Sequence, residues 1–114
     1  MVNEWLAALR NGKYKQGIHF LRNKHNEFCC LGVLCDILPE GEWVRNGHKH
    51  YTFRADEEWV NSTLPTDIIL KFNVPVRTLI KMNDDGISFL EIADYIEKYY
   101  IEEAENYHEP QTKN

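Results

Sequence analysis

Apolar residues recur at helical spacing near both ends of the chain. Trp5, Ala8 and Leu9 fall on one face of a helix that Asn3 can cap and Gly12 can end. Towards the C-terminus, Ser88 and Glu91 have the spacing of a capping box. The apolar stripe that follows consists of Phe89, Ile92, Ala93, Ile96 and Tyr99. The stripe is lost after Tyr100, so we expect residues 101–114 to form an acidic, frayed tail.

Residues 28–38, FCCLGVLCDIL, are apolar on all sides, which is typical of a helix surrounded by the rest of the protein. Asn26 is a suitable N-cap, and Pro39 stops the segment. Gly32 costs about 1 kcal/mol relative to alanine inside a helix, so it predicts a close neighbour there. We therefore expect a buried central helix that packs against the C-terminal apolar stripe and against a hairpin.

The hairpin is predicted over residues 43–53, because Asn46-Gly47 is typical of a two-residue turn between strands. The polar stretch after it is expected to be a loop anchored by Trp59. Pro65 and Pro75 each open a short helix. Residues 13–28 are expected to contain a loop, a short strand and a turn.

These elements predict one α+β domain over residues 1–100, with about five short helices around a central buried helix. The domain also contains a β-hairpin at 43–53. Whether it has one further strand is not decided by the sequence. No apolar stretch approaches the roughly 20 residues that span a bilayer, so no membrane partner is expected. The acidic Glu4 and the absence of a cleavage site do not fit a secretion signal. Three cysteines, two of them adjacent, favour a reducing cytoplasm.

The net charge of −5 hides a division between the two halves. Residues 1–54 hold eight Lys or Arg against five acids, whereas residues 55–114 hold five Lys or Arg against thirteen acids. The basic half favours an anionic ligand, and the acidic half favours a solvated surface or mimicry of a nucleic acid.

GKYKQG, residues 12–17, is the segment best suited to an anion. Its glycines let backbone N–H groups approach, its cations neutralise phosphate, and Tyr14 offers a face for stacking. Asn83 and Asp84 could hydrogen-bond a base or a ribose. The predicted ligand-binding set is Arg10, Lys13, Tyr14, Lys15, Gln16, Gly17, Arg22, Asn83 and Asp84. The segment is not a P-loop, and the plainer alternatives are a basic exposed turn and a turn that leads into the Ser88 cap.

The three cysteines are expected to pack in the core. The catalytic alternative places Cys29 at a helix start, where the dipole lowers a thiol pKa, with His48 or His50 as base. A zinc site is not favoured, because adjacent helical side chains diverge by about 100° and no second pair of ligands exists. The sequence predicts no metal and no cofactor.

Four blocks of the chain resemble a family of small proteins encoded by tailed bacteriophages and prophages. The blocks are WLAALRNGKYKQG with the following Leu21-Arg22, FCCLGVLCDI, STLPTDIILKFNV and LIKMNDDGISFLEIADYIE. Together they cover roughly residues 5 to 97. The resemblance implies a phage accessory protein in the cytoplasm of an infected bacterium, and it supplies no activity.

We therefore predict a phage counter-defence protein that binds and sequesters a phosphorylated small molecule, such as a nucleotide immune signal, without turning it over. Direct nucleic-acid binding is not favoured. The alternative is an inhibitor of a host defence or transcription complex that acts through the acidic half. A cysteine-dependent hydrolase is the third hypothesis. Whether the working form is an oligomer is left open.

Overall fold

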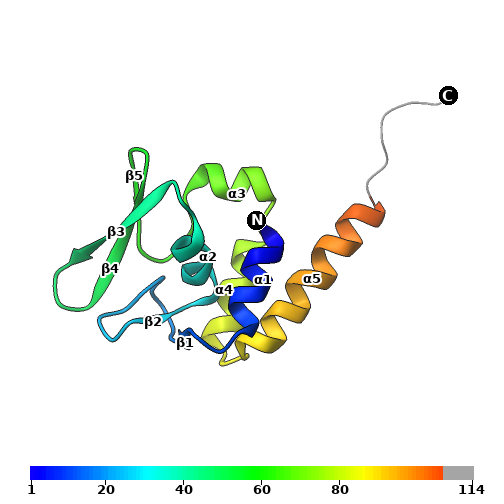
Figure 1. Cartoon of the computed structure of the whole chain (residues 1–114), viewed down its shortest axis with the longest axis horizontal. Coiled ribbons are helices and arrows are strands. Elements are labelled where there is room, and N and C mark those ends of the chain that lie inside the picture. The colour runs from blue at the N-terminus through cyan, green and yellow to red at the C-terminus, as the bar shows by residue number, and fades with distance from the viewer. Residues whose placement is uncertain (107–114) are drawn as a thin grey trace.

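The chain folds into a sheet end and a helical end, with one buried helix between them. Figure 1 shows the computed structural model, which describes residues 1–106. The helices are α1 (Val2–Arg10), α2 (Cys30–Ile37), α3 (Thr66–Phe72), α4 (Val76–Asp84) and α5 (Phe89–Asn106). The strands are β1 (Lys15–Gln16), β2 (Glu27–Phe28), β3 (Gly41–Asn46), β4 (His50–Ala55) and β5 (Glu58–Val60). The fold is α+β, as predicted.

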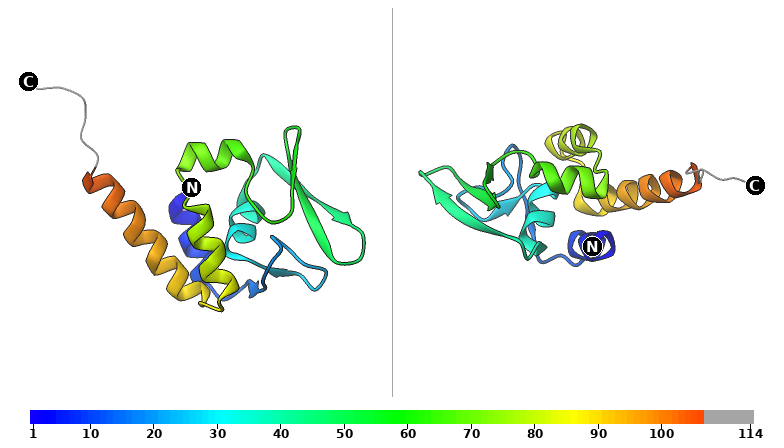
Figure 2. Two further views of the ribbon diagram at one scale, coloured as in Figure 1. Left: turned by 180° about the vertical axis from the view of Figure 1, so that it is seen from behind. Right: turned by 90° about the horizontal axis from the view of Figure 1, so that it is seen from above.

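α1, α4 and α5 form the helical end. In the view from above, α5 lies between α1 and α4 (Figure 2, right), so its apolar stripe is covered on two sides. Ile92, Ala93 and Ile96 are fully buried, as the helical spacing predicted. Trp5 on α1 is also buried, and its indole N–H donates to the carbonyl oxygen of Cys30 at 2.9 Å. This bond ties α1 to the central helix.

The central helix is α2, and residues 30–35 are buried on every side, as expected. It begins at Cys30 rather than near Asn26, because Asn26 has φ 59° and belongs to the preceding turn. Its closest neighbours are α1 and α4. The buried side chains of α2 belong to the same core cluster as Ile92 and Ile96 of the C-terminal stripe and Phe53 of the hairpin. A Cβ at Gly32 would lie 1.8 Å from the carbonyl oxygen of Leu21. The close neighbour predicted at this glycine is therefore the backbone of a loop.

β3, β4 and β5 form an antiparallel sheet in that order. Asn46 pairs with His50, so the hairpin has a three-residue loop instead of the expected two-residue turn, with Gly47 in the left-handed region. Residues 58–60 were expected to lie in a loop, but they pair with β4 as β5. The turn between β4 and β5 contains no glycine, and Asp56 adopts the left-handed conformation there, with φ 55°. Trp59 on β5 does not anchor a loop in the core, since it is 55% exposed.

α1 begins at Val2 with Met1 as its N-cap, so Asn3 lies inside the helix and does not cap it as expected. Other boundaries agree with the sequence. Pro65 and Pro75 directly precede α3 and α4. The hydroxyl oxygen of Ser88 accepts the backbone N–H of Glu91 at 3.2 Å, as in a capping box. α5 continues to Asn106, six residues beyond the expected end of its stripe, and the rest of the predicted tail lies outside the described residues. None of the described helices combines the length and the apolar composition needed to cross a membrane.

Candidate functional site

Two segments of the chain contain no acidic residue, and the fold brings them together. Residues 5–26 and 43–55 hold all eight Lys and Arg of the first half and no Asp or Glu. The backbone N–H of Lys24 donates to the carbonyl of Lys49, and that of Tyr51 donates to the carbonyl of Arg22, both at 2.9 Å. The loop before β2 is thus joined to the tip of the β3–β4 hairpin. We name the surface formed by Arg22, Lys24, Arg45 and Lys49 the basic edge.

Arg22 makes more side-chain contacts than the other cations of the basic edge. Its guanidinium carbon lies 3.8 Å from the centroid of the Tyr51 ring and 5.5 Å from that of Trp43. Its Nη2 and Nε donate to the side-chain oxygen of Asn26 at 2.7 and 3.0 Å. Arg45 lies over the same tyrosine ring at 5.6 Å. Stacking and hydrogen bonding fix the plane of the Arg22 guanidinium, which prepares it to meet a phosphate or a carboxylate.

Tyr14 lies near this stack but is not a free stacking face. Its hydroxyl donates to Asp36 at 2.5 Å, and the indole N–H of Trp43 donates to the same carboxylate at 2.9 Å. Burial and the Asp36 carboxylate raise the pKa of the Tyr14 hydroxyl. The ring meets Phe28 edge to face, with centroids 5.1 Å apart. Tyr14 therefore links the first loop to α2 and β3, and base stacking on this side chain finds no support in its surroundings.

Asn83, predicted to contact the ligand, is instead completely buried. Its side-chain oxygen accepts the backbone N–H of Cys30 at 3.0 Å and the side-chain N–H of Gln16 at 3.1 Å. Its side-chain nitrogen donates to the carbonyl of Gly17 at 2.7 Å. Because the first N–H groups of a helix have no partner within it, Asn83 supplies the cap that α2 lacks. This side chain cannot reach a ligand on the surface.

Gln16 caps the start of α5 in the same way that Asn83 caps the start of α2. Its side-chain oxygen accepts the backbone N–H of Phe89 at 3.2 Å, and its side-chain nitrogen also donates to the carbonyl of Ile87 at 2.7 Å. Gly17 is buried beside Asn83. Gln16, Gly17 and Asn83 thus form an internal polar network, which we name the Gln16–Asn83 network. These three members of the predicted ligand set are structural in the described fold.

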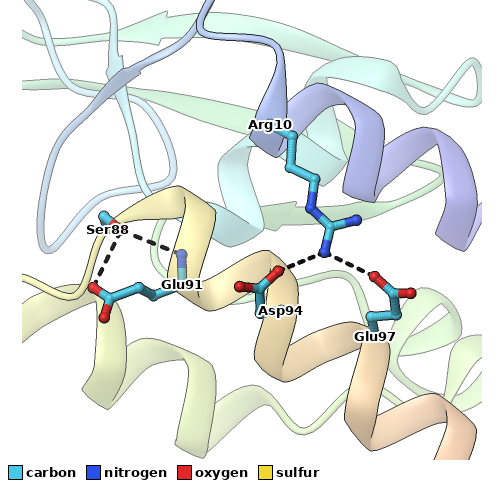
Figure 3. A network of polar contacts seen from close by, with 5 residues as sticks. All are labelled: Arg10, Ser88, Glu91, Asp94 and Glu97. Carbon is cyan, nitrogen blue, oxygen red and sulfur yellow. Dashed lines mark hydrogen bonds and ion pairs between the residues drawn. The ribbon is translucent and has the colours of Figure 1, made fainter.

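Arg10 and Asp84, also predicted to bind the ligand, lie far from each other in the sequence and make contacts outside the basic edge. Figure 3 shows Arg10 reaching from α1 to α5, where its guanidinium contacts Asp94 at 2.7 Å and Glu97 at 2.8 Å. These hydrogen bonds to Glu97 and Asp94 raise the pKa of Arg10. Asp84 accepts the backbone N–H of His19 at 3.2 Å. Arg10 and Asp84 are therefore engaged away from the basic edge.

Lys13, before β1, and Lys15, within it, are both exposed. The ammonium group of Lys15 lies 3.3 Å from the carboxylate of Glu27. Hydrogen bonds from Asn23 and then Lys15 lower the pKa of Glu27. Of the predicted ligand set, Arg22 is the member that the fold places in the basic edge.

The cysteines are buried, as the core interpretation predicted. Cys29 precedes α2, and burial raises the pKa of its thiol to about 11, although the backbone N–H groups of Gly32 and Leu31 act in the opposite direction. Burial likewise raises the pKa of Cys30 and Cys35. A thiol with a raised pKa is protonated at neutral pH and is a poor nucleophile.

The surroundings of Cys29 do not contain the expected base. The cavity beside it has a volume of about 10 Å³, enough for roughly one water, and His19 and Asp84 are among its lining residues. His48 and His50 do not line it. His50 stacks on Phe20, with ring centroids 4.4 Å apart. Among the residues that the structure describes, no three His, Cys, Asp or Glu side chains gather where they could hold a metal ion.

Lys24, Arg45 and Lys49 were not predicted from the sequence to lie with Arg22 in one surface. The available signal was the absence of acids from residues 5–26 and 43–55, which marks both segments before their contact is known. The contact itself could not be found from sequence, because it depends on two backbone hydrogen bonds between a loop and a hairpin.

The fold and the basic edge define a small α+β domain with a preformed cationic surface. A family model described as "Domain of unknown function (DUF8296)" matches residues 1–100, and the chain belongs to this family. No curated protein and no solved structure matches the chain.

Proposed function

We propose that this protein binds a phosphorylated small molecule at the basic edge. The observation that carries the proposal is the fixed guanidinium of Arg22, which is stacked on Tyr51 and lies in a part of the surface built from acid-free segments. A cation held in place before binding loses little conformational freedom when an anion arrives. The positions of Lys24, Arg45 and Lys49 add three further charges, which suits a ligand with two or more phosphate groups.

Binding without catalysis is the activity best supported by the surroundings of the reactive groups. The Cys29 thiol is buried with a raised pKa, and the cavity beside it is far smaller than a substrate. In the phage setting that the sequence resemblance implies, an abundant protein that captures a nucleotide immune signal in the cytoplasm of an infected cell would need no turnover. Counter-defence by sequestration is therefore the role that we propose.

Isothermal titration calorimetry of the intact chain with ADP, ADP-ribose and a cyclic dinucleotide tests the proposal. We expect at least one of them to bind, and the Arg45→Ala and Lys49→Ala variants to weaken that binding roughly tenfold each. Lys98→Ala is the matched control, because it removes an exposed lysine from α5. The affinity should also fall as the salt concentration rises.

Arg22→Lys sharpens the test. It keeps the positive charge but removes the planar fork that stacks on Tyr51, so it should bind more weakly than wild type. Far-ultraviolet circular dichroism of each variant checks that the fold is retained. Absence of binding heat with all three ligands would refute this function, and equal binding by Arg45→Ala and wild type would exclude the basic edge as its site.

The alternative, inhibition of a host complex through the acidic half, remains a prediction. Glu102 and Glu103 are exposed on α5, and the carboxylate of Glu103 accepts a hydrogen bond from Asn73 at 3.4 Å. The side chain of Glu105 lies outside the described residues.

A further inference from the structure

Two adjoining clefts lie at the opposite end of β3 and β4 from the basic hairpin tip. The first has a volume of about 630 Å³ and is lined mainly by Glu40, Glu42, Arg54, Asp56, Glu57 and Trp59. The second, of about 520 Å³, shares Glu40 and Asp56 with the first and extends to Asp67, Leu70 and Lys71 on α3. Figure 1 shows the start of β3, the β4–β5 turn and α3 on one side of the molecule. We name this continuous depression the end groove.

An exposed apolar side chain stands at each end of the end groove. Trp59 is 55% exposed and Leu70 is 74% exposed. The Arg54 guanidinium lies 5.1 Å from the centroid of the Trp59 ring and is paired with Glu42. Trp59 is therefore held in position rather than free to turn inward, and its remaining surface faces solvent. Both side chains are available as hydrophobic anchors.

Carboxylates lie between the two anchors. Within the part of the chain that the structure describes, Glu40, Asp56 and Glu57 make no side-chain hydrogen bond and no ion pair, and the same is true of Asp67 on α3. With Glu42 included, five acids line the groove against Arg54 and Lys71, a net charge of −3. Of these two cations, Arg54 is already neutralised by Glu42. The groove therefore presents unpaired negative charge between two apolar contacts.

We propose that the end groove is a docking surface for a cationic, amphipathic segment of a partner protein, with Lys or Arg side chains set between apolar ones. Charge complementarity selects the cations, which can meet Glu40, Asp56 and Glu57. The apolar residues of the segment would cover Trp59 and Leu70. A polyamine would satisfy the carboxylates but leave both anchors in water. The proposal does not rest on ligand binding at the basic edge, because the two surfaces have opposite charge and lie at opposite ends of the strands.

A second copy of this chain is a less suitable occupant. Its own basic edge consists of Arg22, Lys24, Arg45 and Lys49, and one large exposed apolar side chain, Ile18, comes from the same acid-free segments. A segment that fills the end groove needs apolar residues at two separated positions as well as cations. The partner is therefore expected to be a different basic protein.

The test uses a fluorescein-labelled synthetic peptide in which arginines are interspersed with leucines, titrated with the intact chain while anisotropy is measured. We expect a Kd on the order of 10 μM at low salt, typical of a small charged interface. Glu57→Lys should weaken binding roughly tenfold. Glu102→Lys is the matched control, because it makes the same charge change on α5, and it should bind like wild type. A peptide with glutamate in place of arginine should not bind.

Tryptophan fluorescence supplies a second readout that does not depend on charge. Trp59 is more exposed than Trp5 or Trp43, so the bound peptide should shift the emission to shorter wavelength. Trp59→Phe should abolish this shift while keeping most of the binding, whereas Trp59→Ala should weaken binding. Circular dichroism checks the fold of both variants.

Four results would overturn the proposal. They are absence of peptide binding, equal weakening by Glu57→Lys and Glu102→Lys, spermine binding as tight as the peptide, and a wild-type dimer in sedimentation that Glu57→Lys dissolves. The last would assign the groove to a second copy. Nucleotide titrations of Glu57→Lys keep the two proposals apart, because loss of peptide binding with unchanged nucleotide binding concerns the end groove alone.

Discussion

The Gln16–Asn83 network and the Arg10 ion pairs are both polar contacts between distant parts of the chain, yet their surroundings differ completely. Asn83 is fully buried and satisfies backbone groups of Cys30 and Gly17. Arg10 holds the carboxylates of Asp94 and Glu97 on the surface (Figure 3). The Asp94 side chain is 76% exposed. A lost partner inside the protein leaves polar groups without water, whereas a lost partner on the surface is replaced by water.

The comparison shows that a polar residue within a sequence motif does not have to bind a ligand, because it can serve the fold instead. Gln16 and Asn83 have the residue types of a binding site, but they act as helix caps supplied from elsewhere in the chain. Arg10 has the charge of a phosphate contact, but it joins α1 to α5. Three predictions test this contrast, beginning with the largest effect.

Asn83→Ala should be the most damaging of these changes. It leaves the N–H of Cys30 and the carbonyl of Gly17 buried without partners and opens a small cavity, so we expect a loss of about 3–5 kcal/mol in the free energy of unfolding. Urea denaturation measures this loss. Asn3→Ala is the matched control, because Asn3 is exposed on α1, and it should change stability little. A loss below about 1 kcal/mol for Asn83→Ala would mean that water replaces the network.

The cysteines provide an intermediate effect that depends on pH. Because the pKa of Cys29 rises to about 11 in the folded protein, its thiol stays protonated there at a pH that ionises it in the unfolded chain. The unfolded state then binds fewer protons, so stability should fall between about pH 9 and pH 11. Cys30 and Cys35, with pKa values raised in the same direction, add to this loss.

Thermal denaturation across this pH range measures the effect, and thiol labelling near neutral pH complements it. We expect all three thiols to react slowly until denaturant is added. Cys29→Ser should leave ligand binding intact. Rapid labelling of Cys29 in the native protein would contradict its burial and revive the hydrolase alternative.

Arg10→Ala should have the smallest effect. Water can solvate the freed Asp94 and Glu97 carboxylates, so the change in melting temperature should be slight and should shrink as salt is added. Binding at the basic edge should be unaffected, because Arg10 lies at the α1–α5 contact. A decrease in stability comparable to that of Asn83→Ala would show that the ion pairs hold the helical end together.

Local signals in the sequence predicted most of the helices, because their causes are local. Ser88 and Glu91 cap α5, while Pro65 and Pro75 begin α3 and α4. β5 was missed because the turn before it is made by Asp56 in a left-handed conformation, where glycine or asparagine is usual. The start of α2 was also misplaced, because its cap is Asn83, far away in the sequence.

The candidate site was less predictable than the fold. The basic character of the first half pointed to an anion, and the fold places Arg22 in a cationic surface. The partners of Arg22 could not be identified, because Tyr51, Arg45 and Lys49 reach it only through the pairing of a loop with the hairpin. Residue type alone also could not separate Gln16, which caps α5, from Lys15 beside it, which is exposed.

The contacts of Gln16 and Asn83 also constrain the order in which the chain can be completed as it leaves the ribosome. The cap of α2 comes from a residue made 53 positions after Cys30, and the contact of Gln16 with α5 spans 73 positions. A short helix is unstable until its end groups are satisfied and its apolar surface is covered. The central helix should therefore not be stably folded during synthesis until α4 and α5 have emerged. The domain should then fold late and in a single step.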